Sequence, residues 1–120
     1  MPRAKNNVAS RRRRKKILHN AKGYWGSKSR LFKTAKESVE QSMLYAYRDR
    51  RARKREFRKL WILRINAAIR PYGLNYSGFV HQLNEQKIQL NRKILADLAV
   101  MDPVAFSKIV EHVQKTKQTS

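Results

Sequence analysis

The hydrophobic pattern divides one long helical segment into three parts. Residues 31–70 contain neither Gly nor Pro, so the sequence predicts one continuous helix there, about 60 Å long and longer than a small domain is wide. Part of that helix is therefore expected to project from its own core. Its middle, from Arg48 to Lys59, has almost no apolar positions, whereas a stripe of apolar residues precedes it and a regular i, i+4, i+7, i+8, i+11 stripe follows it. The first stripe comprises Leu31, Ala35, Val39, Met43, Ala46 and Tyr47, and the second comprises Trp61, Ile65, Ala68, Ile69 and Tyr72.

Three shorter helices are predicted after the long one, because Pro71 and Gly73 end it and new start signals follow. The predicted N-caps are Asn75 or Ser77, then Asn91, then Asp102, which is followed by Pro103 at a first helical position. The residues expected to face inward are Phe79, Val80 and Leu83, then Ile94, Leu95, Leu98 and Met101, and finally Phe106, Ile109, Val110 and Val113.

The pattern as a whole predicts an all-α protein. No strand-like alternation persists, although residues 88–90 suit a short extended link. We expect a long basic helical N-terminal extension over residues 1–59, followed by a small globular C-terminal bundle of about four helices over residues 60–120. Roughly sixty residues is near the lower limit for independent folding, so the bundle is expected to be marginal without a partner.

The N-terminal segment is dominated by the basic run from Arg11 to Lys16. Such a run buries nothing that would offset the entropy of ordering, so we expect it to be disordered when free. A short helix from about Ser10 to Lys22 fits the pattern, with Ser10 as N-cap and Gly23 beyond its end. The alternative is a solvated basic tail or a nuclear-localisation run.

Two aromatic residues follow in the sequence GYWGSKSR, residues 23–30. Glycine permits positive φ and close approach of a partner to the backbone. The rings of Tyr24 and Trp25 can stack on unpaired bases or wedge beside sugars. They suit equally well a turn whose rings pack on the neighbouring helix, although the basic segments on either side favour nucleic acid.

Charge identifies the class of partner. The chain carries 29 Lys and Arg against 8 Asp and Glu, a formal net charge of +21, and residues 1–59 alone contribute +17 of it. Such an excess repels itself in a compact isolated state. A phosphate backbone is its natural counter-charge, since binding also releases counterions. An anionic membrane surface is the competing partner, but it calls for amphipathic basic helices or a lipid anchor, and we find neither a myristoylation start nor a prenylation end.

Nothing in the sequence indicates catalysis, a metal site, a cofactor or a small-molecule substrate. There is no Cys, so disulfides and thiolate ligands are excluded. His19, His81 and His112 lie in different segments, and Glu37 and Glu40 have no further carboxylates beside them. No apolar run reaches the ~18 residues of a membrane span, and the basic start lacks the apolar core of a secretory signal. We therefore expect a soluble, intracellular, non-enzymatic protein.

Three stretches resemble a known family: YAYRDRR (45–51), RKREFRKLWILRINAA (53–68) and LNRKILADLAV (90–100). They are closely similar to the bacterial-type large-subunit ribosomal protein family numbered twenty. RRKKILHNAKGYWG (13–26) and YS (76–77) follow that family's order and spacing. The resemblance covers nearly the whole chain, although the run from Arg11 to Lys16 is more continuous than is usual in the family.

The resemblance implies a structural constituent of the large ribosomal subunit. Members bind large-subunit (23S-type) rRNA early in assembly, lie beside other large-subunit ribosomal proteins, and in some cases repress translation of their own mRNA. It also implies a cytoplasmic location in a bacterial-type ribosome, with an organellar ribosome as the alternative. A DNA-binding or chromatin-like protein is the competing interpretation, but residues 71–120 hold no basic recognition helix.

The candidate rRNA-binding residues are taken as one group, since no individual contact follows from the sequence. The resemblance implies Arg13, Arg14, Lys15, Lys16, Lys22, Tyr24, Trp25, Arg48, Arg50, Arg51, Arg53, Lys54, Arg55 and Arg58, and the charge pattern adds Arg3, Lys5, Arg11, Arg12, Lys28 and Arg30.

Overall fold

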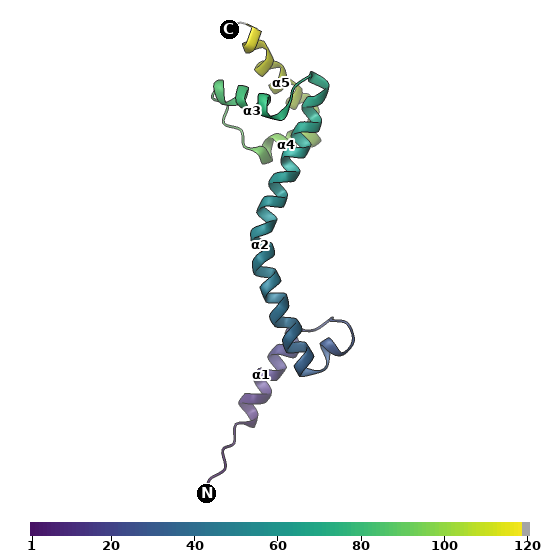
Figure 1. Cartoon of the computed structure of the whole chain (residues 1–120), viewed down its shortest axis with the longest axis vertical. Helices are drawn as coiled ribbons and strands as arrows, with labels where there is room; N and C mark the ends of the chain where they lie inside the picture. Colours follow the sequence, from purple (N-terminus) through teal and green to yellow (C-terminus); the bar gives the residue numbers. More distant parts are fainter. Residues whose placement is uncertain (119–120) are drawn as a thin grey trace. The chain divides into compact units, whose positions relative to one another are not determined.

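The computed structural model describes residues 1–118, and in that range it contains helices and the segments that connect them but no strand (Figure 1). The all-α prediction is confirmed. The chain divides into two compact units, Met1–Arg51 and a second that begins at Ala52, and each is described by itself. The elements are α1 (Asn7–Asn20), η1 (Gly26–Ser29), α2 (Phe32–Ile69), η2 (Arg70–Tyr72), α3 (Tyr76–Glu85), α4 (Arg92–Met101) and α5 (Pro103–Gln118).

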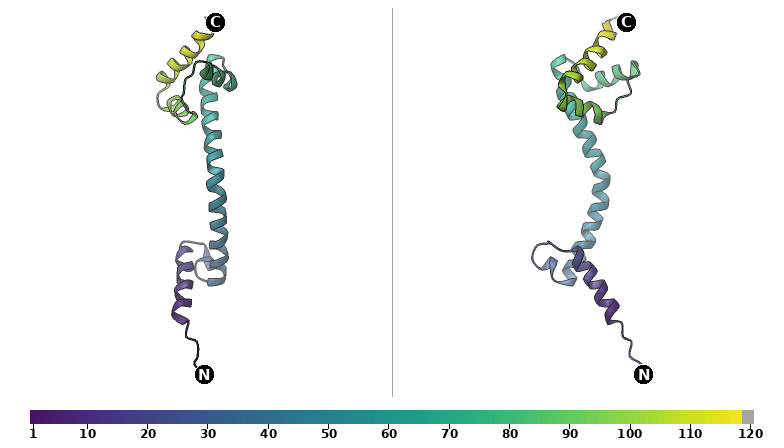
Figure 2. Two further views of the ribbon diagram at one scale, coloured as in Figure 1. Left: turned by 90° about the vertical axis from the view of Figure 1, so that its left-hand side faces the viewer. Right: turned by 180° about the vertical axis from the view of Figure 1, so that it is seen from behind.

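In the first unit, α1 lies beside the first turns of α2, as the two views of Figure 2 agree. The contact is small: Ala21, Ala35 and Val39 are buried together, and partly buried residues of α1 pack around them. Ala21 and Ala35 let the two backbones approach closely because their side chains are short.

The predicted N-cap of α1 is wrong. The helix begins at Asn7, and the capping position is Asn6, whose side chain makes no capping bond. The Ser10 amide already donates to the Asn6 carbonyl at 3.0 Å, so Ser10 lies inside the first turn. No Gly or Pro separates Asn6 from Ser10, and the helix therefore extends one turn further back than a favourable capping residue suggested.

The prediction of one long helix is confirmed to within one residue at each end, since α2 has 38 residues from Phe32 to Ile69. Between Glu40 and Leu60 every residue except Ala52 is exposed. Only Ala35 and Val39 of the first apolar stripe are buried, whereas Met43 and Tyr47 face solvent. Most of this helix thus has no partner within the chain's own cores.

The second unit packs α3, α4 and α5 around the last turns of α2 (Figure 1). Phe79 of α3 and Phe106 of α5 lie with ring centroids 6.1 Å apart. Around these rings lies one core, whose buried members are Ile65, Ile69, Phe79, Leu83, Leu95, Ala96, Phe106, Val110 and Val113. The partly buried Trp61 packs against the same core from the preceding turn of α2.

The predicted caps of the three short helices are confirmed. Asn75 Oδ1 accepts from the Gly78 amide at 2.7 Å, and it is Asn75, not Ser77, that caps α3. Asn91 Oδ1 accepts from the Ile94 amide at 2.8 Å, and Asp102 Oδ1 accepts from the Ala105 amide at 3.0 Å. These bonds satisfy amides that a helix start otherwise leaves without a partner.

Three predicted core positions are wrong. Ile94 is 43% exposed and Met101 84% exposed, and Tyr72 is exposed as well. The buried side of α4 runs instead through Leu95 and Ala96. A methyl side chain at Ala96 lets α4 approach the other helices closely, which turns the longer Ile94 and Met101 outward.

Candidate nucleic-acid interface

The basic run of α1 is a solvent-facing surface. All six residues from Arg11 to Lys16 are exposed, and α1 has no buried residue and no acidic residue in its first turn. Arg14 is held in place, because its guanidinium lies over the Phe32 ring at 5.2 Å from the centroid. Within residues 1–118, no cation of this run forms an ion pair with a carboxylate. The α1 surface therefore presents uncompensated positive charge.

The middle of α2 has the same character over a longer stretch. Arg48 pairs with the adjacent Asp49 at 3.0 Å and Lys59 with Glu56 at 3.2 Å, and both pairs are well exposed. Exposed pairs of this kind contribute little to stability. The remaining cations of the stretch have no acidic partner among the described residues: Arg50, Arg51, Arg53, Lys54, Arg55 and Arg58.

Spacing along α2 places like charges next to one another. Arg50 and Lys54, and Arg51 and Arg55, stand four residues apart on a helix, where like charges repel. Arg51 is additionally fixed to Tyr47, donating to its hydroxyl at 2.6 Å with the guanidinium 4.7 Å from the ring centroid. A helix that is polar all round and self-repelling indicates an external partner of opposite charge.

The two aromatic residues of the glycine-bracketed turn differ in burial. Gly23 and Gly26 adopt φ values of 84° and 58°, a left-handed conformation that glycine adopts readily. Tyr24 packs on the small cluster of Ala21, Ala35 and Val39, which matches the structural interpretation of that ring. Trp25 is 91% exposed and packs on no core. Trp25 is thus the ring that is free to contact a partner.

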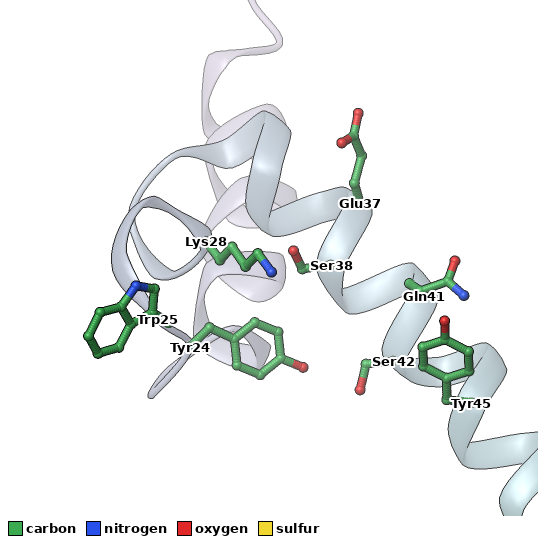
Figure 3. Close-up of a pocket in the computed structure, with 8 residues that line it drawn as sticks. All are labelled: Tyr24, Trp25, Lys28, Glu37, Ser38, Gln41, Ser42 and Tyr45. Carbon is green, nitrogen blue, oxygen red and sulfur yellow. The ribbon is translucent and has the colours of Figure 1, made fainter.

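An open groove of about 720 Å³ lies between this turn and α2 (Figure 3). In Figure 3 the Tyr24 ring and the Lys28 side chain extend toward α2, while the Trp25 indole turns outward at the edge. The lining residues are Tyr24, Trp25 and Lys28 from the turn and Glu37, Ser38, Gln41, Ser42 and Tyr45 from α2.

The structure brings some of the predicted residues together and leaves others apart. Tyr24, Trp25 and Lys28 share the groove, and Arg48 lies just beyond it with its guanidinium 4.7 Å from the Tyr45 ring centroid. Arg3 and Lys5 precede α1, and Lys22 and Arg30 flank the turn; all four are exposed. Arg50, Arg53, Lys54, Arg55 and Arg58 continue along α2 beyond the groove.

Sequence reasoning missed the α2 side of the groove. Ser38, Gln41, Ser42 and Tyr45 are ordinary residues of a helix, and only the i, i+3, i+4, i+7 spacing of the four places them on one face. The spacing alone could have identified this face of α2. Which segment of the chain lies opposite it depends on how the turn over residues 23–30 folds back toward α2.

No arrangement of ionisable side chains suggests a reaction centre. Among residues 1–118 no three His, Asp or Glu side chains gather as a metal ion would require. His81 lies 3.1 Å from Glu85 on the exposed side of α3, and His19 and His112 are exposed. None of the helices within the described range has both the length and the apolar character needed to cross a bilayer.

Comparison with known proteins identifies the family. The family model described as "Ribosomal protein L20" matches residues 3–109. A protein of Salinibacter ruber named "Large ribosomal subunit protein bL20" is 58% identical over 115 residues, covering 96% of this chain and 100% of its own. Proteins of the same name from Carboxydothermus hydrogenoformans and Lactococcus lactis are 61% and 57% identical, covering 98% and 97% of their own lengths. The chain therefore belongs to the ribosomal protein L20 family, whose members are structural components of the ribosome and not enzymes.

Proposed function

We propose that this protein is a structural constituent of the large subunit of a bacterial-type ribosome, where it binds large-subunit rRNA directly and promotes its folding during assembly. The observation that carries the proposal is the run of exposed cations from Arg48 to Lys59 of α2, most of which have no acidic partner in the described chain. The names of its relatives, which are large-subunit ribosomal proteins, support the same conclusion.

The mechanism follows from the charges. RNA helices repel one another through their phosphates, and a rod of Lys and Arg between them lets them approach. Arg suits this role because its planar guanidinium offers several donors to phosphate oxygens at once. Shape and backbone would dominate recognition of the duplex regions, since the deep major groove of A-form RNA hides its base edges.

We propose that the parts of the chain before and after the start of the C-terminal domain at Leu60 have different roles. Residues 1–59 would form the rRNA-penetrating extension, with the candidate rRNA-binding residues acting as a group, and residues 60–120 would form a globular rRNA-binding domain. The charge pattern supports this division, because the net charge is +17 before Leu60 and +4 from there on. Neighbouring large-subunit ribosomal proteins would be its protein partners.

Chemical footprinting of large-subunit rRNA with and without the full-length protein tests the proposal. We expect protection of a limited set of backbone positions at near-stoichiometric protein and moderate salt. A duplex DNA of equal length is the control, and it should compete weakly. Equal or tighter binding to that DNA would favour a DNA-binding protein instead.

We also propose that the protein represses translation of its own mRNA, as the family resemblance implies, through the same RNA-binding surface. A translation reporter carrying the mRNA leader should be repressed by the intact protein. Repression should be lost when Arg50, Arg53 and Lys54 are all changed to Ala. A reporter that responds identically to both proteins would contradict the proposal.

A further inference from the structure

The groove between the glycine-bracketed turn and α2 is not explained by charge neutralisation alone. A helix that only screens phosphates needs exposed cations and no hollow. We propose that this groove binds a single unpaired nucleotide of the RNA. This inference rests on the proposed function and specifies which form of RNA this part of the surface binds.

Aromatic residues line both sides of the groove, with Tyr24 and the freely exposed Trp25 on the turn and Tyr45 on α2. Tyr24 extends from the turn toward α2, and Tyr45 stands on α2 with its ring lying along the helix beside Gln41 (Figure 3). Tyr45 is 47% exposed and belongs to neither hydrophobic core, and the Arg48 guanidinium that lies 4.7 Å from its ring centroid leaves about half of the residue open to a ligand. Unstacked bases stack on aromatic rings of this kind, whereas bases inside a duplex keep their faces covered.

Polar groups lie between the rings. Ser38 and Ser42 stand one helical turn apart, with the Gln41 amide beside them. None of these three side chains bonds to another group within residues 1–118, so their donors and acceptors are available to a ligand. A base edge carries both donors and acceptors, and hydroxyl and amide groups can match either.

The charges around the groove favour an anionic ligand over an uncharged one, and the aromatic rings favour a nucleotide over an acidic peptide. Lys28 reaches across from the turn toward Ser38, and Arg48 lies against the Tyr45 ring. Glu37 is the only acidic residue of the lining, and its carboxylate points away from the turn in Figure 3. The groove volume of about 720 Å³ lies within the range of small-ligand sites. Base-stacking rings beside phosphate-binding cations are the two elements that single-strand recognition combines.

The experiment uses the full-length protein and two RNA probes. Fluorescence anisotropy would measure binding of a single-stranded 12-nucleotide RNA and of a 12-base-pair duplex RNA at several salt concentrations. The test variant is Tyr45→Leu. The matched control is Tyr47→Leu, because Tyr47 also lies on α2, is 56% exposed and carries an Arg guanidinium 4.7 Å from its ring, but does not line the groove.

We expect Tyr45→Leu to weaken single-strand binding about tenfold, in keeping with the loss of one stacking ring, without changing duplex binding or the slope of log K against log salt. Tyr47→Leu should leave both affinities within about twofold of the unsubstituted protein. Ser42→Ala, which removes the hydroxyl and leaves the rest of the side chain, should show the same selectivity with a smaller loss.

Two results would overturn the inference. If Tyr45→Leu and Tyr47→Leu have equal effects on both probes, the groove holds no nucleotide, and the proposed rRNA binding stands as long as a large-subunit rRNA fragment still binds. If the unsubstituted protein binds neither the probes nor the rRNA fragment, the proposed function fails and the inference with it.

Discussion

At the residue scale, two residues of α4 show that an apolar side chain is not necessarily a buried one. Leu95 is 3% exposed within the core of the second unit, and Met101, six residues later on the same helix, is 84% exposed. Leu95→Ala should lower the free energy of unfolding by about 2–5 kcal/mol, since it removes buried methyl groups and leaves a cavity. Urea unfolding followed by Trp61 fluorescence, in a Trp25→Phe background that removes the exposed indole signal, measures this change.

Met101→Ala is the control for that measurement. Its side chain makes no buried contact to lose, so we expect a change within about 0.5 kcal/mol. Equal destabilisation by the two substitutions would show that α4 turns Met101 as well as Leu95 toward the core.

The same two positions show what could be predicted from the sequence and what could not. Leu95 and Met101 both belong to an apolar pattern with helical spacing, and that pattern predicted that both would face inward. Which face is buried depends on where a short helix docks, a tertiary property that local pattern does not contain. The caps were predictable because Asn75, Asn91 and Asp102 act on amides only three residues away.

At the element scale, α4 depends on its cap. Asn91 accepts from the Ile94 amide, and α4 has no acidic residue in its first turn to assist it. Asn91→Ala should destabilise the second unit by about 1 kcal/mol, whereas Asn91→Asp should be close to neutral because a carboxylate caps equally well. Thermal unfolding by circular dichroism at fixed salt compares the two variants, and equal losses for Ala and Asp would argue against a capping role.

Binding and stability should separate in the middle of α2. Arg50 is exposed, lacks an acidic partner in the described chain and stands four residues before Lys54. Arg50→Ala should therefore leave the unfolding midpoint almost unchanged, because it removes a repulsion and no buried contact. It should weaken binding to large-subunit rRNA and lower the slope of log K against log salt by about 1.

Lys108→Ala on α5 is the control for Arg50→Ala, since Lys108 is also exposed but lies outside the predicted rRNA-binding group. Salt-dependent filter binding of both variants measures the slopes. An equal loss of slope at the two positions would mean that α5 of the C-terminal domain contacts phosphate as closely as α2 does, and that α2 has no special role.

The long helix shows why the candidate site was only partly predictable. The uninterrupted run from Leu31 to Arg70 and its change of composition at Leu60 are properties of adjacent residues, and both were read from the sequence. The groove depends on the turn at Gly23 and Gly26 folding over α2, so that Lys28 and Tyr45 line one space although they are far apart in sequence. Nothing local to Tyr45 signals that arrangement.

At the scale of the whole molecule, charge and buried surface are divided unequally along the chain. Residues 1–59 carry a net charge of +17, while the only buried cluster before Ala52 consists of Ala21, Ala35 and Val39. The core of the second unit has nine buried residues among those described, Phe79 and Phe106 included. Fixing the backbone of one residue costs about 1–2 kcal/mol in conformational entropy. Only the second unit buries enough apolar side chains to offset a substantial part of that cost. We therefore expect the helices of the first unit to depend on an external counter-charge for stability.

A fragment of residues 1–59 tests that dependence directly. Alone in dilute buffer it should show little helix by circular dichroism, because long-range repulsion and a three-residue cluster leave helix formation unfavourable. Adding a large-subunit rRNA fragment, with the RNA spectrum subtracted, should raise the helical signal to that of α1 and the first part of α2. A fragment beginning at Ala52 is the matched control. It should unfold cooperatively with or without RNA, because all the residues of the main hydrophobic core lie within it. A stable helix in free residues 1–59 that RNA leaves unchanged would mean that α2 is held by its own sequence, and that rRNA binds a preformed rod.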